Sequence, residues 1–206
     1  MARQSSREAR VEGRGVMDLF SKVYWQRHFG GARRFHAERL VGGGETVFHH
    51  SASTALLLVN ILRERCSVNL LKAALCHDLE EGVTGDIPAP VKWEYGNQLE
   101  ALEARVREGY DIPTPELTEE ERRWLKAADF LDATFTCLEQ RLAGNTFVDS
   151  IYFASQKFER RTELIRLSGL SEMTELWTAI GYEYELLRRR NPSCATESNR
   201  LWLWGK

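Results

Sequence analysis

The sequence has no apolar run long enough for a membrane-spanning helix, and its first residues, MARQSSREARVEGRG, lack the apolar stretch of a secretory signal. These absences predict a cytoplasmic protein that does not enter a membrane. An excess of one charge is also missing, because 28 Lys and Arg stand against 30 Asp and Glu, for a formal net charge of -2. Without an overall positive field, nucleic-acid binding is not expected, and an anionic ligand has to be bound locally.

The four cysteines include no C-x-x-C pair, so neither a zinc knuckle nor a redox couple is indicated. Cys76 directly precedes His77, and its thiol could be either a metal ligand or a small buried apolar group. The neighbours Ala74 and Leu75 favour the buried apolar group.

Strand patterns are missing as well. No alternating β-branched run bounded by turn residues appears, and apolar residues recur with the helical period through most of the chain. We therefore predict an all-α fold, a compact bundle of about six or more helices. A length of 206 residues fits a single domain.

The two ends of the chain differ in composition from the middle. Residues 1–15 are rich in Arg, Ser, Glu and Gly, which predicts a flexible N-terminal tail. Residues 191–206 contain Asn-Pro and many polar side chains, which predicts a C-terminal tail. This tail ends in a Leu-Trp-Leu-Trp sequence, which has to dock on the body or on a second subunit to avoid exposure. We expect one domain, 16–190, in a homo-oligomer.

Five helices can be placed from the apolar spacing. The first carries His50 on an apolar stripe, the second ends near Gly82 before a loop, and the third opens with a capping box at Thr118. Their expected ranges are about 45–64, 67–82, 118–145, 147–168 and 171–190.

Polar residues interrupt the second of these helices. His77 and Asp78 lie in the otherwise apolar segment LLKAALCHDLEE, where a carboxylate needs a cation or a metal to offset its desolvation. Adjacent residues point about 100° apart around a helix, so both can reach one metal only if it lies beside that helix.

Two carboxylates raise the same problem on the third helix. Asp129 and Asp132 share the stripe that this helix should bury, so they too need a cation. Arg122 and Arg123 are candidate partners, although both can extend outward to solvent. A divalent cation bound by two imidazoles and two carboxylates would satisfy the buried groups together and leave positions free for water and phosphate.

The spacing of His50, His77-Asp78 and Asp129 resembles the H…HD…D signature of the HD-domain superfamily of metal-dependent phosphohydrolases. The segment HDLEEGVTGDIPAPVK resembles the HD-x-x-E-x-x-x-GD-[IL]-P-x-P-x-K stretch of bacterial 5'-deoxynucleotidases. Arg34-Phe35-His36 resembles their Arg-Trp element and the Arg-Trp-His element of phage dATP triphosphohydrolases. The resemblance extends over roughly residues 30–145.

This resemblance implies an HD-domain fold and a metal-dependent phosphohydrolase that acts on deoxynucleotides. The implied cofactor is a divalent metal ion (Co, Mn, Zn or Mg). The resemblance also implies a role for each residue of the motifs. The metal ligands would be His50, His77, Asp78 and Asp129. Glu81 would position or deprotonate the attacking water, and Asp86 would assist near the leaving oxygen. Substrate contacts would come from Arg34, Phe35, His36 and Lys92.

The sequence leaves the substrate open. His36 favours a deoxynucleoside triphosphate, whereas GDIPAPVK favours a monophosphate. Hydrolysis of cyclic nucleotides or of guanosine tetraphosphate is an alternative against which the GDIP segment argues. A catalytically silent nucleotide-binding protein is a further alternative, and the presence of Glu81 and Asp86 beside the ligands argues against it.

Individual residues also have alternative interpretations. His49 stands next to His50, so either imidazole could be the ligand, although the following Ser51 and the family spacing favour His50. Three glycines, 42–44, make the position of the Arg34–Phe35 pair relative to the metal uncertain.

The proposed substrate contacts have ordinary alternatives too. Arg34 and Lys92 could be surface charges, and Phe35 could be a core aromatic.

Overall fold

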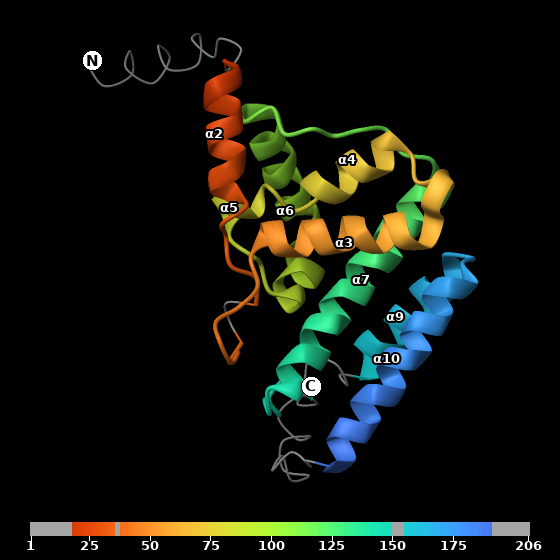
Figure 1. Ribbon diagram of the computed structural model, residues 1–206. Coiled ribbons are helices and arrows are strands. Elements are labelled where there is room, and N and C mark those ends of the chain that lie inside the picture. Colours follow the sequence, from red (N-terminus) through yellow and green to blue (C-terminus); the bar gives the residue numbers. More distant parts are fainter. Residues whose placement is uncertain (1–17, 36–37, 150–154, 191–206) are drawn as a thin grey trace.

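The computed structural model describes residues 18–35, 38–149 and 155–190, and these residues form helices joined by short connections (Figure 1). Within them, the only extended pairing is an isolated bridge between Arg33 and Thr46, so the predicted all-α fold is confirmed. The elements are α2 (Leu19–Phe29), α3 (Val47–Leu62), the 3-10 turn η1 (Arg63–Arg65), α4 (Val68–Cys76), α5 (Glu81–Thr84), α6 (Ala89–Gly109), α7 (Glu119–Leu142), α9 (Ser155–Leu167) and α10 (Ser171–Arg190).

The main core lies where α3 and α4 pack against α7, and α9 and α10 cover the other side of α7 (Figure 1). Its buried side chains include Leu58 on α3, Leu70 on α4, Leu131 on α7 and Met173 on α10. Burying one such side chain stabilises the fold by about 1.5–3 kcal/mol. The long helix α7 is therefore the central element of the bundle.

The start of α7 follows the predicted capping box. The Thr118 hydroxyl accepts a hydrogen bond from the Glu121 N–H (3.2 Å), and Glu121 Oε2 accepts one from the Thr118 N–H (2.8 Å). The predicted helices 45–64 and 171–190 are also present, as α3 and α10.

One predicted helix boundary is wrong. The helix expected to run to Gly82 ends at Cys76, and residues 77–80 form a turn. Arg107 on α6 donates to the His77 carbonyl, so a tertiary contact replaces helical hydrogen bonding there. Of the helix expected near 147–168, the described residues contain α9, while Phe147 lies in a turn and its N–H donates to Asn145 Oδ1 (3.0 Å).

The helices α2 and α6 are additions that the sequence analysis did not place. The predicted tails, 1–15 and 191–206, lie outside the described residues, as does His36. The domain limits and the homo-oligomer stay predictions. No helix among the described residues is long and apolar enough to cross a membrane, and the cytoplasmic location stays a prediction.

A second, smaller core joins α2 to the turn that follows α4. Phe29, Val47 and Leu79 are buried in it, and the half-buried Cys76 packs against it, which agrees with an apolar role for this thiol. The backbones approach closely here, because a Cβ on Gly82 would lie 2.3 Å from the Cα of Phe29. Only glycine fits at that contact between α2 and α5.

Candidate metal centre and active site

The four predicted metal ligands come from three separate parts of the fold, and three of them lie around the imidazole of the fourth, His50. His50 lies in the first turns of α3, His77 and Asp78 in the turn after α4, and Asp129 on α7. His50 Nε2 lies 3.0 Å from His77 Nε2, 3.2 Å from Asp129 Oδ1 and 3.5 Å from Asp78 Oδ2. His77 Nε2 lies 3.4 Å from Asp78 Oδ2.

The outer nitrogens of both imidazoles are bound to acceptors. His77 Nδ1 donates to the Ala74 carbonyl (2.8 Å), and His50 Nδ1 lies 2.6 Å from Asp132 Oδ2. A carbonyl oxygen only accepts, so His77 carries its proton on Nδ1 and presents the lone pair of Nε2 to the cluster. Ligand atoms of His50, His77 and Asp78 lie within 4.8 Å of one another, and this mixed set of nitrogen and carboxylate oxygen atoms fits a divalent metal ion.

The charges within the cluster shift its pKa values strongly. Burial lowers the pKa of His50, but hydrogen bonds with Asp129 and Asp132 outweigh it and raise the pKa to about 9. Burial raises the pKa of Asp129, but the charge of Lys126 and the hydrogen bond with His50 hold it well below its usual value. Both shifts show that this point of the fold attracts positive charge.

Of the two adjacent histidines, His50 enters the cluster and His49 does not. The His50 side chain is fully buried, whereas that of His49 is 66% exposed and lies 3.0 Å from Glu45 through its Nδ1. Consecutive helix residues point about 100° apart, so one buried side chain leaves its neighbour outside.

The two arginines considered as alternative partners of Asp129 contact other groups. Arg122 pairs with Glu119, and Arg123 donates to the Glu119 carbonyl. Lys126, which the sequence analysis missed, lies 2.7 Å from Asp129 Oδ2. The sequence could have indicated this pair, since Lys126 and Asp129 are three residues apart and residues at that spacing share one helix face.

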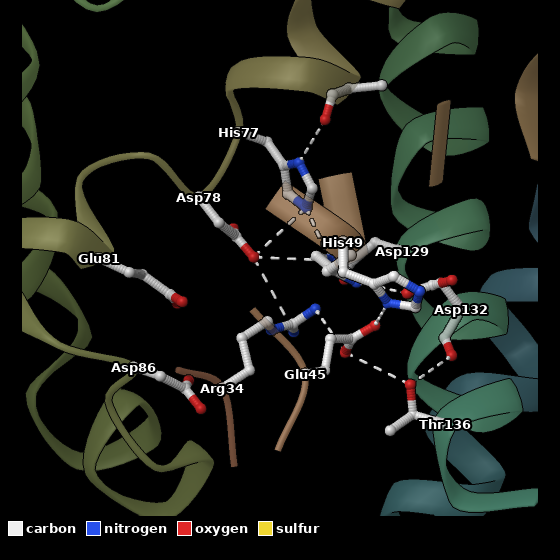
Figure 2. A network of polar contacts seen from close by, with 12 residues as sticks. Arg34, Glu45, His49, His77, Asp78, Glu81, Asp86, Asp129, Asp132 and Thr136 are labelled. Atoms are coloured by element: carbon white, nitrogen blue, oxygen red, sulfur yellow. Dashed lines mark hydrogen bonds and ion pairs between the residues drawn. The ribbon is translucent and has the colours of Figure 1, made fainter. Parts of the chain in front are cut away.

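Arg34 lies beside the cluster (Figure 2). Its Nη2 is 3.9 Å from Asp78 Oδ2 and its Nη1 is 3.9 Å from Glu45 Oε2, while its side chain is 11% exposed. Arg34 is therefore no ordinary surface charge. Its Nε and Nη1 are buried without hydrogen-bond partners in the described part of the chain, which leaves donors for an anionic ligand.

The glycine-rich spacer brings Arg34 back toward α3. Gly42 and Gly43 adopt left-handed conformations (φ 78° and 80°), which let the loop reverse. The Arg34 N–H then donates to the Glu45 carbonyl (2.8 Å), and Arg33 pairs with Thr46 in the isolated bridge. The spacer thus positions Arg34 at the cluster.

Glu81 is a buried carboxylate on α5, directed toward Asp78 and Arg34 (Figure 2). Its Oε1 accepts from Lys92 Nζ at 3.0 Å, so Lys92 belongs to the site, and its Oε2 is buried without a hydrogen-bond partner among the described residues. Burial raises the pKa of Glu81 to about 8, with a further contribution from the charge of Asp78. Such a group is suited to exchange a proton with a ligand.

Asp86 contacts the loop that carries the aromatic residue. Its Oδ2 accepts a hydrogen bond from the Phe35 N–H at 2.5 Å. Phe35 has a left-handed backbone (φ 54°), its side chain is half-buried, and the guanidinium carbon of Arg34 lies 5.4 Å from its ring centroid. Asp86 therefore anchors the Arg34–Phe35 loop to the loop before α6.

No family model matches the chain. Several curated relatives carry the name 5'-deoxynucleotidase, and three of them illustrate the match. The protein of Photorhabdus temperata is 33% identical over 50% of this chain and 64% of its own length. That of Enterobacter sp. (strain 638) is 28% identical over 58% of this chain and 71% of its own length. That of Cronobacter sakazakii is 30% identical over 49% of this chain and 63% of its own length.

The match thus spans about half of this chain and, for the first of these relatives, less than two thirds of the relative. These relatives confirm the resemblance of the chain to bacterial 5'-deoxynucleotidases that the HD and GDIP motifs indicate.

Proposed function

We propose that the protein is a divalent-metal-dependent phosphohydrolase that removes the phosphate of deoxynucleoside 5'-monophosphates. The observation that carries this proposal is the gathering of four ligand side chains beside the buried carboxylate of Glu81 and the buried guanidinium of Arg34. The ligands are His50, His77, Asp78 and Asp129. The names of the curated relatives support a monophosphate as the substrate.

The four ligands would hold the metal through two imidazole nitrogens and two carboxylate oxygens. When bound there, a divalent cation supplies two things, a lower pKa for bound water and positive charge for the phosphoryl oxygens. His77 is prepared for ligation, because the Ala74 carbonyl fixes its proton on Nδ1.

Glu81 is the group that takes the proton of the attacking water. Its Oε2 is buried without a hydrogen-bond partner among the described residues, and the ionised form of this carboxyl group can accept a proton there from a ligand. Lys92 holds the other oxygen at 3.0 Å and fixes the direction of the carboxylate.

Arg34 binds the phosphate. A guanidinium offers several N–H donors in a planar fork that matches phosphate oxygens, and two of its nitrogens lack hydrogen-bond partners in the described residues. The aromatic ring of Phe35 lies next to this guanidinium and is placed to pack against the sugar.

A nucleotide panel with Co, Mn, Mg and Zn tests the proposal, with the products separated as orthophosphate or tripolyphosphate. We expect orthophosphate from deoxynucleoside monophosphates and loss of turnover after chelation. Tripolyphosphate from a triphosphate would reassign the substrate, and turnover confined to cyclic nucleotides or guanosine tetraphosphate would reassign the reaction. A metal-loaded protein without turnover on any nucleotide would contradict the proposal that this protein is an enzyme.

A further inference from the structure

Asp132 lies against the side of His50 that faces away from the ligand cluster. Its Oδ2 is 2.6 Å from His50 Nδ1, while Nε2 of the same ring faces His77 and Asp129. Both partners are buried, with His50 at 0% and Asp132 at 3% relative exposure. In the described part of the chain, the ion pair of Asp132 is with His50.

Helix α7 therefore contacts both nitrogens of one imidazole. Asp129 lies 3.2 Å from Nε2 and Asp132 lies 2.6 Å from Nδ1. Residues three apart share a helix face and are separated by about 4.5 Å along the axis, so the two carboxylates reach opposite sides of the ring. The position of the ring is thereby fixed relative to α7.

The two imidazoles of the cluster are held by different kinds of acceptor. His77 Nδ1 donates to the Ala74 carbonyl, which helix α4 supplies whatever the side chain at that position. His50 depends on a side chain, the carboxylate of Asp132. A carboxylate partner raises the basicity of a ligating imidazole more than a neutral carbonyl does.

We propose that Asp132 is the positioning residue for His50, holding its proton on Nδ1 so that Nε2 presents a lone pair to the metal. This proposal rests on the metal site of the proposed function and assigns a further residue to it. Partners of this kind typically contribute about 10- to 100-fold to metal affinity.

A competing role for Asp132 is direct ligation. Glu45, His50 and Asp132 also bring potential ligand atoms within 4.8 Å of one another. In that arrangement Nδ1 would have to lose its proton, and the protein would bind two ions instead of one. The number of bound ions therefore separates positioning from ligation.

The test compares Asp132→Asn with the wild type and with Asp149→Asn. In Asp132→Asn the amide oxygen can still accept from Nδ1, but the negative charge is gone. Asp149 offers a matched control, because this half-buried carboxylate pairs with Arg141 and Tyr184 and belongs to none of the residues assigned to the site. Co²⁺ and Zn²⁺ affinity is measured by competition with a chelator, and the metal-free thermal midpoint is recorded for each protein.

We expect one ion per wild-type chain, an affinity about 10- to 100-fold lower in Asp132→Asn, and an unchanged affinity in Asp149→Asn, whatever either change does to the thermal midpoint. Equal affinities of Asp132→Asn and wild type would overturn the proposal. A fall from two ions to one in Asp132→Asn would overturn it too, since Asp132 would then be a ligand. A wild-type chain that binds no ion would overturn the proposed function first and this assignment with it.

A measurement on the unaltered protein covers the case in which Asp132→Asn does not fold. Nitrogen-15 spectra of the Zn²⁺-loaded wild type distinguish the two ring nitrogens of each histidine. We expect His50 to be protonated on Nδ1 and bound to zinc through Nε2. Zinc on Nδ1 of His50 would contradict the positioning role.

Discussion

The Phe35 N–H donates to Asp86 Oδ2 over 2.5 Å, so a carboxylate from the loop before α6 holds a residue in the left-handed conformation 51 positions earlier. Non-glycine residues adopt that conformation at a cost, and the hydrogen bond offsets it. The arrangement gives Asp86 a task that differs from the expected assistance near the leaving oxygen, which stays a prediction.

Replacing Asp86 separates these two tasks. Asp86→Ala removes the acceptor of the Phe35 N–H, and we expect kcat/KM to fall about 10- to 100-fold, the size of one hydrogen bond to a charged group. Asp86→Asn keeps an acceptor oxygen, so its loss should be smaller. Equal losses in the two variants would show that the negative charge matters and not the anchor.

Phe35 is expected to select the deoxy sugar. A 2'-hydroxyl packed against its ring would lose water without gaining a partner, which costs about 1–3 kcal/mol and corresponds to about 10- to 100-fold discrimination. Phe35→Ala should narrow the gap between deoxy and ribo substrates, chiefly by loss of deoxy activity. The test measures kcat/KM for one deoxynucleotide and the matching ribonucleotide in the wild type and in Phe35→Ala. An unchanged ratio of the two values, together with lower stability, would make Phe35 a packing residue.

Glu81→Gln should lower kcat by about 10²- to 10⁴-fold, because the amide cannot take a proton from water. Metal content should stay unchanged, since Glu81 does not belong to the four predicted ligands. Measuring bound metal and single-turnover rates on the same preparation checks both statements. If metal is lost together with activity, Glu81 is a ligand.

Asp78→Ala should abolish both metal binding and turnover. Asp78 Oδ2 lies within 3.5 Å of the Nε2 atoms of His50 and His77, so its removal takes one donor from the cluster and leaves the others poorly satisfied. Metal analysis after dialysis and an activity assay provide the readout. Full activity in this variant would refute the metal assignment.

His49 and His50 form a natural matched pair. We expect His50→Ala to lose the metal, and His49→Ala to keep nearly all of the metal and the activity, because the His49 side chain is 66% exposed and pairs with Glu45. Metal content of the two variants, prepared side by side, gives the answer. Loss of metal in His49→Ala alone would exchange the two assignments.

The resemblance to the H…HD…D signature singled out the residues of the cluster, and their surroundings agreed with it. His50 lies on an apolar helix face and the His77–Asp78 pair in an apolar segment, which predicts that the fold turns them inward. The sequence could not predict how the ligand atoms of these residues are arranged around one another. This arrangement requires α4 to end at Cys76, just before the His77 carbonyl that accepts a hydrogen bond from Arg107 on α6.

The partner of Asp132 was equally beyond the sequence. The stripe on α7 shows that this carboxylate needs compensation, but His50 lies 82 positions away, and only the crossing of α3 and α7 brings them together. The same limit explains why α2 and α6 were not placed. Among their described side chains α2 buries Phe29 and α6 buries Val106, so neither helix shows an apolar stripe with a clear period.

The contact between Gly82 and Phe29 has a mechanical consequence. Because a Cβ at Gly82 would lie 2.3 Å from the Phe29 Cα, α5 packs directly against the backbone of α2. Helix α2 thus fixes the backbone position of the adjacent Glu81. A truncation or a tightly fused tag that pulled α2 away would admit water to Glu81 and let its raised pKa return toward that of an ordinary glutamate.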